Sequence, residues 1–172
     1  MRDEREPGFE ELMAAQAPSL LRAAYLLTGD RGLAEDLVQT TLTKAFLARS
    51  RIVSADSPPA YLRRILVNAH SRSLRGRRVR EQLTADVPER AAEWVEPAVD
   101  ADLVRAVAAL PKRQRAVVVL RYLEDRSEAD VAAILGCSVG TVKSQASRAL
   151  ATLRRHPALS APEALITEEA HS

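Results

Sequence analysis

Residues 139–155 carry the clearest chemical pattern in the chain. Apolar residues recur there at helical spacing, and the positions between them hold hydrogen-bond donors and no acid. These outward residues are Thr141, Lys143, Ser144, Gln145, Ser147 and Arg148. Donor groups of this kind contact phosphate oxygens and the edges of bases. The segment therefore predicts a helix that binds nucleic acid, with an ordinary helical hairpin that has a polar face as the alternative.

The residues just before this helix predict how it is presented. Ser127 is placed to cap a first short helix, with Asp130 at the capping-box position. Gly136 stands where a left-handed residue ends that helix, and Ser138 is placed to cap the next one. Two short helices joined by such a turn are typical of a helix-turn-helix, whose second helix enters the major groove of DNA.

A second group of cations lies on a helix expected at about residues 59–79. Leu62, Ile65 and Leu66 form its predicted inward face. Its other faces carry Arg63, Arg64, Arg72, Arg75, Arg77 and Arg78.

Charge is segregated along the chain, although its total is only +2. Residues 50–80 carry eight basic residues and one acid, and residues 111–155 carry nine basic residues and four acids. Residues 81–110, between these blocks, carry two basic residues and seven acids. Two basic blocks separated by an acidic one indicate two surfaces that face a polyanion, whereas solvated basic helix faces with local acidic partners are the alternative.

Residues suited to catalysis or to metal binding are scarce. The three histidines, His70, His156 and His171, are widely separated, and the one cysteine excludes a disulfide framework and a multi-cysteine zinc site. The chain has no metalloprotease, nucleophile-elbow, P-loop or dinucleotide-binding motif. We therefore expect no catalytic residue, no metal, no cofactor and no enzymatic activity.

The elements that must position these residues are all helical, because no segment shows a convincing period of two. We expect an all-α protein of two small domains joined by a flexible linker. The first domain, 8–80, has three helices, at about 8–27 (kinked or broken at Pro18), 31–48 and 59–79. The second, 98–155, has four, at about 98–109, 112–123, 128–135 and 139–155.

The remaining segments are expected to lie outside the helical domains. Residues 81–97 read as an acidic linker, and residues 156–172 as a mostly disordered tail. No apolar run approaches the roughly 20 residues that span a bilayer, and the N-terminus lacks the apolar core of a signal peptide. We therefore expect a soluble cytoplasmic protein without membrane contact.

Four stretches, in the same order along the chain as in a known protein family, resemble sequence motifs of that family. They are residues 25–30 with 34–39, residues 61–65 with Asn68, residues 110–115 through 120–122, and residues 140–144 with 147–150. Together they resemble the extracytoplasmic-function (group four) sigma factors of bacterial RNA polymerase, in the style of small actinobacterial members. The resemblance covers about residues 9–155.

The resemblance implies a function. Such a protein binds core RNA polymerase and directs promoter recognition, DNA melting and transcription initiation. Residues 8–80 would be region two, which binds the β′ coiled coil and the minus-ten element. Residues 98–155 would be region four, which binds the minus-thirty-five element and touches the β flap. The free protein would be a monomer, and an anti-sigma factor is a further candidate partner.

The resemblance also assigns residues to three surfaces. The polymerase-binding set is Asp36, Leu37, Gln39, Thr40 and Thr43. The minus-ten set is Tyr61, Arg63, Arg64, Asn68, Arg72, Arg75, Arg77 and Arg78, with residues 50–57 as the loop that captures a flipped base. The minus-thirty-five set is Thr141, Lys143, Ser144, Ser147 and Arg148.

One departure and one alternative stand beside this assignment. Many relatives carry aromatic residues near the end of the third helix and an acid near position 72, where this chain has Ser73, Leu74 and Arg72. Which residues melt the duplex therefore stays open. The alternative is an autonomous helix-turn-helix regulator, which would leave the surface of helix 31–48 and the extra basic helix unexplained.

Overall fold

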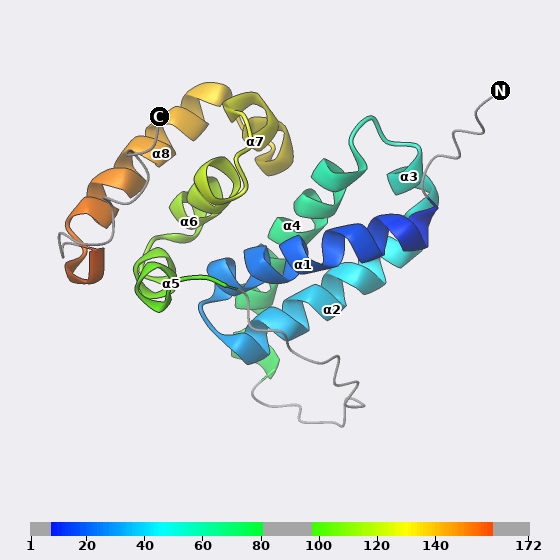
Figure 1. Cartoon of the computed structure of the whole chain (residues 1–172), viewed down its shortest axis with the longest axis horizontal. Coiled ribbons are helices and arrows are strands. Elements are labelled where there is room, and N and C mark those ends of the chain that lie inside the picture. The colour runs from blue at the N-terminus through cyan, green and yellow to red at the C-terminus, as the bar shows by residue number, and fades with distance from the viewer. Residues whose placement is uncertain (1–7, 81–97, 160–172) are drawn as a thin grey trace, which may run out of the picture. The chain divides into compact units, whose positions relative to one another are not determined.

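The computed structural model describes residues 8–80 and 98–159, with the side chains of residues 74–80 left out (Figure 1). Within these ranges every regular element is a helix, so the expected all-α fold is confirmed. The chain divides into two compact units, residues 1–97 and residues 98–172. No helix in the described part of the chain is long and apolar enough to cross a membrane.

The first unit contains α1 (Phe9–Thr28), α2 (Arg31–Leu47), α3 (Arg49–Val53) and α4 (Pro58–Arg80). Helices α1, α2 and α4 pack on one another around buried leucines such as Leu20, Leu27 and Leu66. Burying a side chain of this size stabilises the fold by about 1.5–3 kcal/mol. The short α3 lies where the sequence predicted a loop, and Pro18 lies inside a continuous α1 rather than ending it.

The turn between α1 and α2 is built from local signals. Gly29 has φ of +68°, a left-handed conformation that costs glycine little, and its N–H donates to the carbonyl of Tyr25 at 2.8 Å. Asp30 then caps α2, because its carboxylate accepts from the N–H of Leu33 at 2.9 Å. These two residues reverse the chain so that α2 packs against α1.

The second unit contains α5 (Ala101–Ala108), α6 (Lys112–Val118), the π-helical turn η1 (Val119–Leu123), α7 (Glu128–Leu135), α8 (Val139–Arg154) and the 3₁₀ turn η2 (Pro157–Leu159). Its core holds Val107, Leu110, Leu120, Val131 and Val142, which are all at most 1% exposed. The helix predicted at 112–123 is therefore α6 followed by a π turn.

The start of the predicted tail is ordered. The turn η2 packs against α5, so residues 157–159 belong to the second unit. The predicted linker 81–97 and residues 160–172 lie outside the described residues.

Candidate nucleic-acid interface

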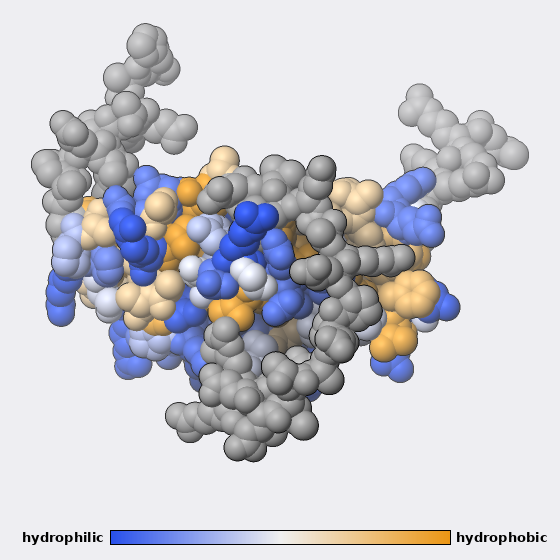
Figure 2. Space-filling view, turned by 90° about the horizontal axis from the view of Figure 1, so that it is seen from below, coloured by the Kyte–Doolittle hydropathy of each residue, from blue (hydrophilic) through white to orange (hydrophobic). Residues whose placement is uncertain are grey.

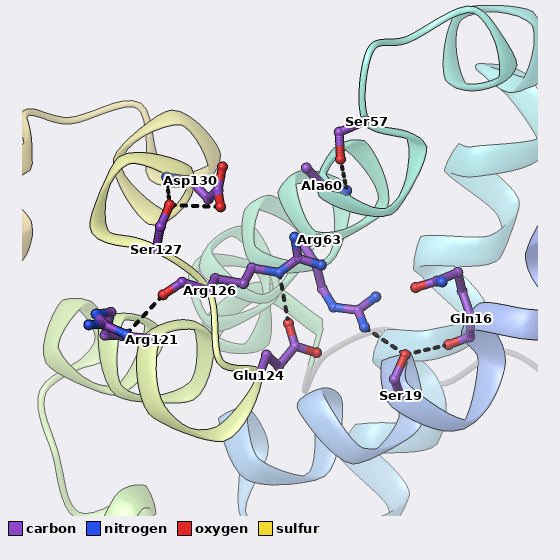
Figure 3. A network of polar contacts seen from close by, with 10 residues as sticks. All are labelled: Gln16, Ser19, Ser57, Ala60, Arg63, Arg121, Glu124, Arg126, Ser127 and Asp130. Atoms are coloured by element: carbon purple, nitrogen blue, oxygen red, sulfur yellow. Dashed lines mark hydrogen bonds and ion pairs between the residues drawn. The ribbon is translucent and has the colours of Figure 1, made fainter.

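Helices α7 and α8 form a helix-turn-helix whose ends are capped as the sequence predicts. The hydroxyl of Ser127 accepts from the N–H of Asp130 at 3.1 Å and donates to the Asp130 carboxylate at 2.7 Å (Figure 3). Gly136 ends α7 with φ of +66°, and the hydroxyl of Ser138 accepts from the N–H of Thr141 at 3.1 Å. Caps at both helix starts and a left-handed turn residue hold the two helices at a defined angle.

Helix α8 separates an apolar face from a polar one. Val142, Ala146 and Ala149 are buried against the rest of the unit. Lys143, Ser144, Ser147 and Arg148 are exposed, and Thr141 and Gln145 are half-buried. All five residues predicted to read the minus-thirty-five element therefore lie on the accessible side of one helix, which itself contains no acid.

Helix α7 brings an acid to this surface. The Nζ of Lys143 lies 3.7 Å from Oε2 of Glu128, the first residue of α7. The pattern within 139–155 gave no sign of this pair, because the two residues are fifteen positions apart and meet only through the turn. Arg148, in contrast, forms no ion pair with any residue that the structure describes.

Several arginines of the second basic block, residues 111–155, bind groups of their own unit rather than extending into solvent. The guanidinium of Arg115 donates to the carbonyls of Ala108 at 2.7 Å and Leu110 at 3.0 Å, and burial lowers its pKa. Arg121 donates to the carbonyl of Arg126 at 3.2 Å, and Arg126 lies 3.5 Å from the Glu124 carboxylate (Figure 3). Arg115 and Arg121 bind backbone carbonyls and Arg126 pairs with a carboxylate of the same unit, so the charge of the block overstates its DNA-facing surface.

One residue of the predicted minus-ten set, Arg63 on α4, is buried, so its predicted role is corrected. Arg63 is only 2% exposed, and its Nη2 donates to the hydroxyl of Ser19 on α1 at 2.7 Å (Figure 3). It belongs to the same helical stripe as the buried residues Leu66, Val67 and His70, which follow it at three, four and seven positions. Arg63 therefore ties α4 to α1 and is not placed to follow the DNA backbone.

Three residues of the predicted minus-ten set lie on the exposed side of α4. Arg64, Asn68 and Arg72 are exposed and recur every four positions, so they share one face. Tyr61 is half-buried at the start of this row. Arg75, Arg77 and Arg78 lie in the last turns of α4, where the side chains are outside the described residues.

On helix α2, the predicted polymerase-binding set likewise divides into buried and exposed residues. Leu37 is 4% exposed and lies in the core, so its side chain is withdrawn from any partner. Asp36, Gln39, Thr40 and Thr43 are exposed and fall at helical spacing on one face. The structure thus retains four of the five predicted residues on an accessible surface.

The end of α2 exposes two large apolar residues that the sequence patterns missed. Phe46 is 56% exposed and Leu47 is 77% exposed. The guanidinium of Arg49 lies 4.6 Å from the centre of the Phe46 ring, and the Phe9 ring meets Phe46 edge to face at 6.4 Å. Figure 2 shows apolar residues reaching the surface beside charged ones. The sequence did hold a signal for Phe46 and Leu47. They lie three and four positions beyond Thr43, so they continue the helix face that carries Gln39 and Thr43.

Comparison with known proteins decides the family. The Sigma-70 region 2 model matches residues 12–80, and the Sigma-70, region 4 model matches residues 100–153. The RNA polymerase sigma-E factor of Streptomyces antibioticus is 39% identical over 148 residues, which cover 85% of this chain and 82% of that protein. The chain belongs to the extracytoplasmic-function sigma factors. The ECF RNA polymerase sigma factor EcfG of Rhodopseudomonas palustris is 36% identical, over 84% of this chain and 81% of that protein.

A solved structure agrees with this membership. The sigma factor RpoE from Bartonella quintana, determined in complex with the anti-sigma factor NepR, is 31% identical with a TM-score of 0.68, over 85% of this chain and 94% of that chain. This sigma factor therefore directs transcription initiation as a non-enzymatic subunit of RNA polymerase, and it binds DNA through the region four helix-turn-helix. The alternative of an autonomous regulator rested on the helix-turn-helix alone. Because both sigma regions match, the sigma-factor prediction is the one confirmed.

Proposed function

We propose that this sigma factor uses three separate helix faces for three partners. The exposed face of α2 binds the β′ coiled coil of core polymerase, the exposed face of α4 reads the minus-ten element, and α8 reads the minus-thirty-five element. The observation that carries the proposal is the chemistry of these faces. α2 ends in exposed apolar residues, whereas the residues predicted to contact DNA on α4 and α8 are cations and hydrogen-bonding groups, with Tyr61 half-buried among them.

The polymerase contact comprises Asp36, Gln39, Thr40 and Thr43, extended by Phe46 and Leu47. Aromatic and aliphatic residues at the centre of a protein interface, with polar residues around them, form a common arrangement of stable complexes. The Arg49 guanidinium over the Phe46 ring keeps that ring in place while leaving more than half of its surface accessible. An apolar surface of this kind gains little from DNA phosphates and much from a protein partner.

The minus-ten contact comprises Arg64, Asn68 and Arg72, with Tyr61 at the near end and Arg75, Arg77 and Arg78 continuing along α4. The arginines bind phosphates, and the Asn68 amide is suited to bonding a base. Of the predicted loop 50–57, residues 50–53 lie in α3, so residues 54–57 between α3 and α4 are the candidate for holding a flipped base, which melting requires.

The minus-thirty-five contact comprises Thr141, Lys143, Ser144, Ser147 and Arg148 at the accessible side of α8. Region four also touches the β flap, as the family resemblance implies. Regulation by an anti-sigma factor is supported by the NepR complex of the Bartonella quintana relative. The free protein is a monomer and acts in the cytoplasm, where it meets polymerase.

Run-off transcription with mapped start sites tests the proposal. Core polymerase with this sigma factor, given a genomic promoter library, should produce transcripts that share two upstream elements. Core polymerase alone should not produce them. Absence of specific transcripts with a competent core, or tight operator binding by the isolated protein without core, would overturn it.

A further inference from the structure

We propose that Glu128 is a specificity-determining residue of region four, because it competes with DNA for Lys143. The carboxylate lowers binding to non-cognate DNA more than binding to the promoter. The inference rests on the proposed role of α8 as the helix that reads the minus-thirty-five element.

The geometry places one acid beside an otherwise acid-free surface. Glu128 is the first residue of α7, and its Oε2 lies 3.7 Å from Nζ of Lys143 on the second turn of α8. The side chains are 36% and 65% exposed, so both remain within reach of a ligand. Among the ion pairs of the described residues, this is the one that joins α7 to α8.

Two of the neighbouring acids are engaged within their own segment, and the exposed Asp125 forms no ion pair with any described residue. Asp130 accepts from the Ser127 hydroxyl, and Glu124 lies against Arg126. Among Glu124, Asp125, Glu128 and Asp130, Glu128 is the acid that forms an ion pair with the recognition helix. Lys143 reaches DNA only by leaving Glu128 or by bringing the carboxylate with it.

This competition affects the two kinds of complex unequally. Non-specific binding comes from phosphate contacts, which a carboxylate beside Lys143 repels. In a specific complex Lys143 can donate to guanine O6 or N7 while Glu128 accepts from the amino group of cytosine. The cost of the carboxylate is then offset at a matching base pair and at no other. Arg148, which has no such pair among the described residues, contributes to both complexes.

A purely structural role for Glu128 is the competing explanation. An acid in the first turn of a helix interacts favourably with the helix dipole. Asp102 on α5 is the matched case, because it also lies in the first turn of an eight-residue helix and pairs with a cation, Arg105. It is far along the chain from α8 and belongs to no predicted DNA contact. Asp102→Asn therefore controls for the loss of a negative charge and for the first-turn interaction with the helix dipole.

The experiment uses holoenzyme assembled from core polymerase and the full chain. Binding to a mapped promoter fragment and to a duplex without promoter elements is measured across a salt series for Glu128→Gln, Lys143→Gln and the double variant. Glu128→Gln should tighten binding to the non-promoter duplex by about threefold to fivefold, with a smaller change at the promoter. Lys143→Gln should cost more in the Glu128→Gln background than in the parent. Asp102→Asn should change neither.

Two results would overturn the inference. One is unchanged binding of Glu128→Gln to the non-promoter duplex. The other is an equal gain in the presence of Lys143→Gln, which would mean that the carboxylate acts without the lysine. The proposed function fails separately, through Arg148→Ala. If that variant leaves promoter use unchanged, α8 does not read the upstream element, whereas a loss with Arg148→Ala and no effect of Glu128→Gln contradicts only the role of Glu128.

Discussion

Helices α4 and α8 are both proposed to contact DNA, and they differ in where their cations lie. On α8 the buried face consists of apolar residues such as Val142 and Ala149, and both basic residues of the predicted set are exposed. On α4 the buried face includes Arg63, which is hydrogen-bonded to Ser19. A basic residue therefore contributes to a DNA-binding surface only when the helical period turns it outward.

The same lesson applies to the rest of the second basic block. Arg115 and Arg121 bind backbone carbonyls of their own unit, while Arg148 extends from α8 without such a contact. Counting charge along the chain predicted two DNA-facing segments, of which the one that contains the helix-turn-helix is confirmed as DNA-binding by its family. It overstated their positive surface, because long basic side chains also bind polar groups of the fold itself.

The largest expected effect separates Arg63 from its neighbour Arg64. Arg63→Ala should lower the free energy of unfolding by about 3 kcal/mol, because it removes a buried side chain and its hydrogen bond to Ser19 on α1. Arg64→Ala should change it by less than about 0.5 kcal/mol, since that side chain is exposed. Urea unfolding of the two variants measures the difference. Equal values would contradict the division of α4 into a buried and an exposed face.

The next largest effect tests α8. Arg148→Ala should weaken promoter binding by the holoenzyme by about tenfold or more, within the range of about 1–3 kcal/mol for a good base contact. Its affinity for core polymerase should be unchanged, because Arg148 lies on the proposed DNA face of α8 and the proposed contact with the β′ coiled coil lies on α2. Competition for core polymerase and promoter-binding titrations measure the two quantities. Loss of core binding would contradict the separation of the surfaces.

A smaller effect tests how the helix-turn-helix holds α8. Ser138→Ala should lower the free energy of unfolding by about 1 kcal/mol, because it removes the acceptor for the N–H of Thr141. Ser147→Ala is the matched control, since its hydroxyl caps no helix. Thermal unfolding of both variants measures the change. Equal melting temperatures for Ser138→Ala and Ser147→Ala would mean that the Ser138 cap contributes no stability.

The smallest effect tests the outward row of α4. Arg64→Ala should reduce the slope of log affinity against log salt by about 0.9 for one lost phosphate contact. Holoenzyme binding to a promoter fragment across a salt series measures it. A slope equal to that of the parent protein would place Arg64 away from the DNA backbone.

The sequence predicted the helix-turn-helix more fully than the first unit, for a physical reason. Ser127, Gly136 and Ser138 act on residues two to four positions away, so their types indicate the caps and the turn directly. The burial of Leu37 follows the helical period of Ala34, Thr41 and Ala45, whereas the burial of Arg63 depends on its packing against α1. The short α3, which begins two residues after Leu47, was indicated by no local signal.

By itself, the sequence determined the helical class, the capped helix-turn-helix, the acid-free face of α8 and the family. These properties depend on spacing along the chain and on hydrogen bonds between near neighbours. Only the tertiary structure decided that Arg63 is buried, that Arg115 serves the backbone and that Glu128 meets Lys143. Each of these contacts joins residues from different helices, and their distance is set by how the apolar faces pack together.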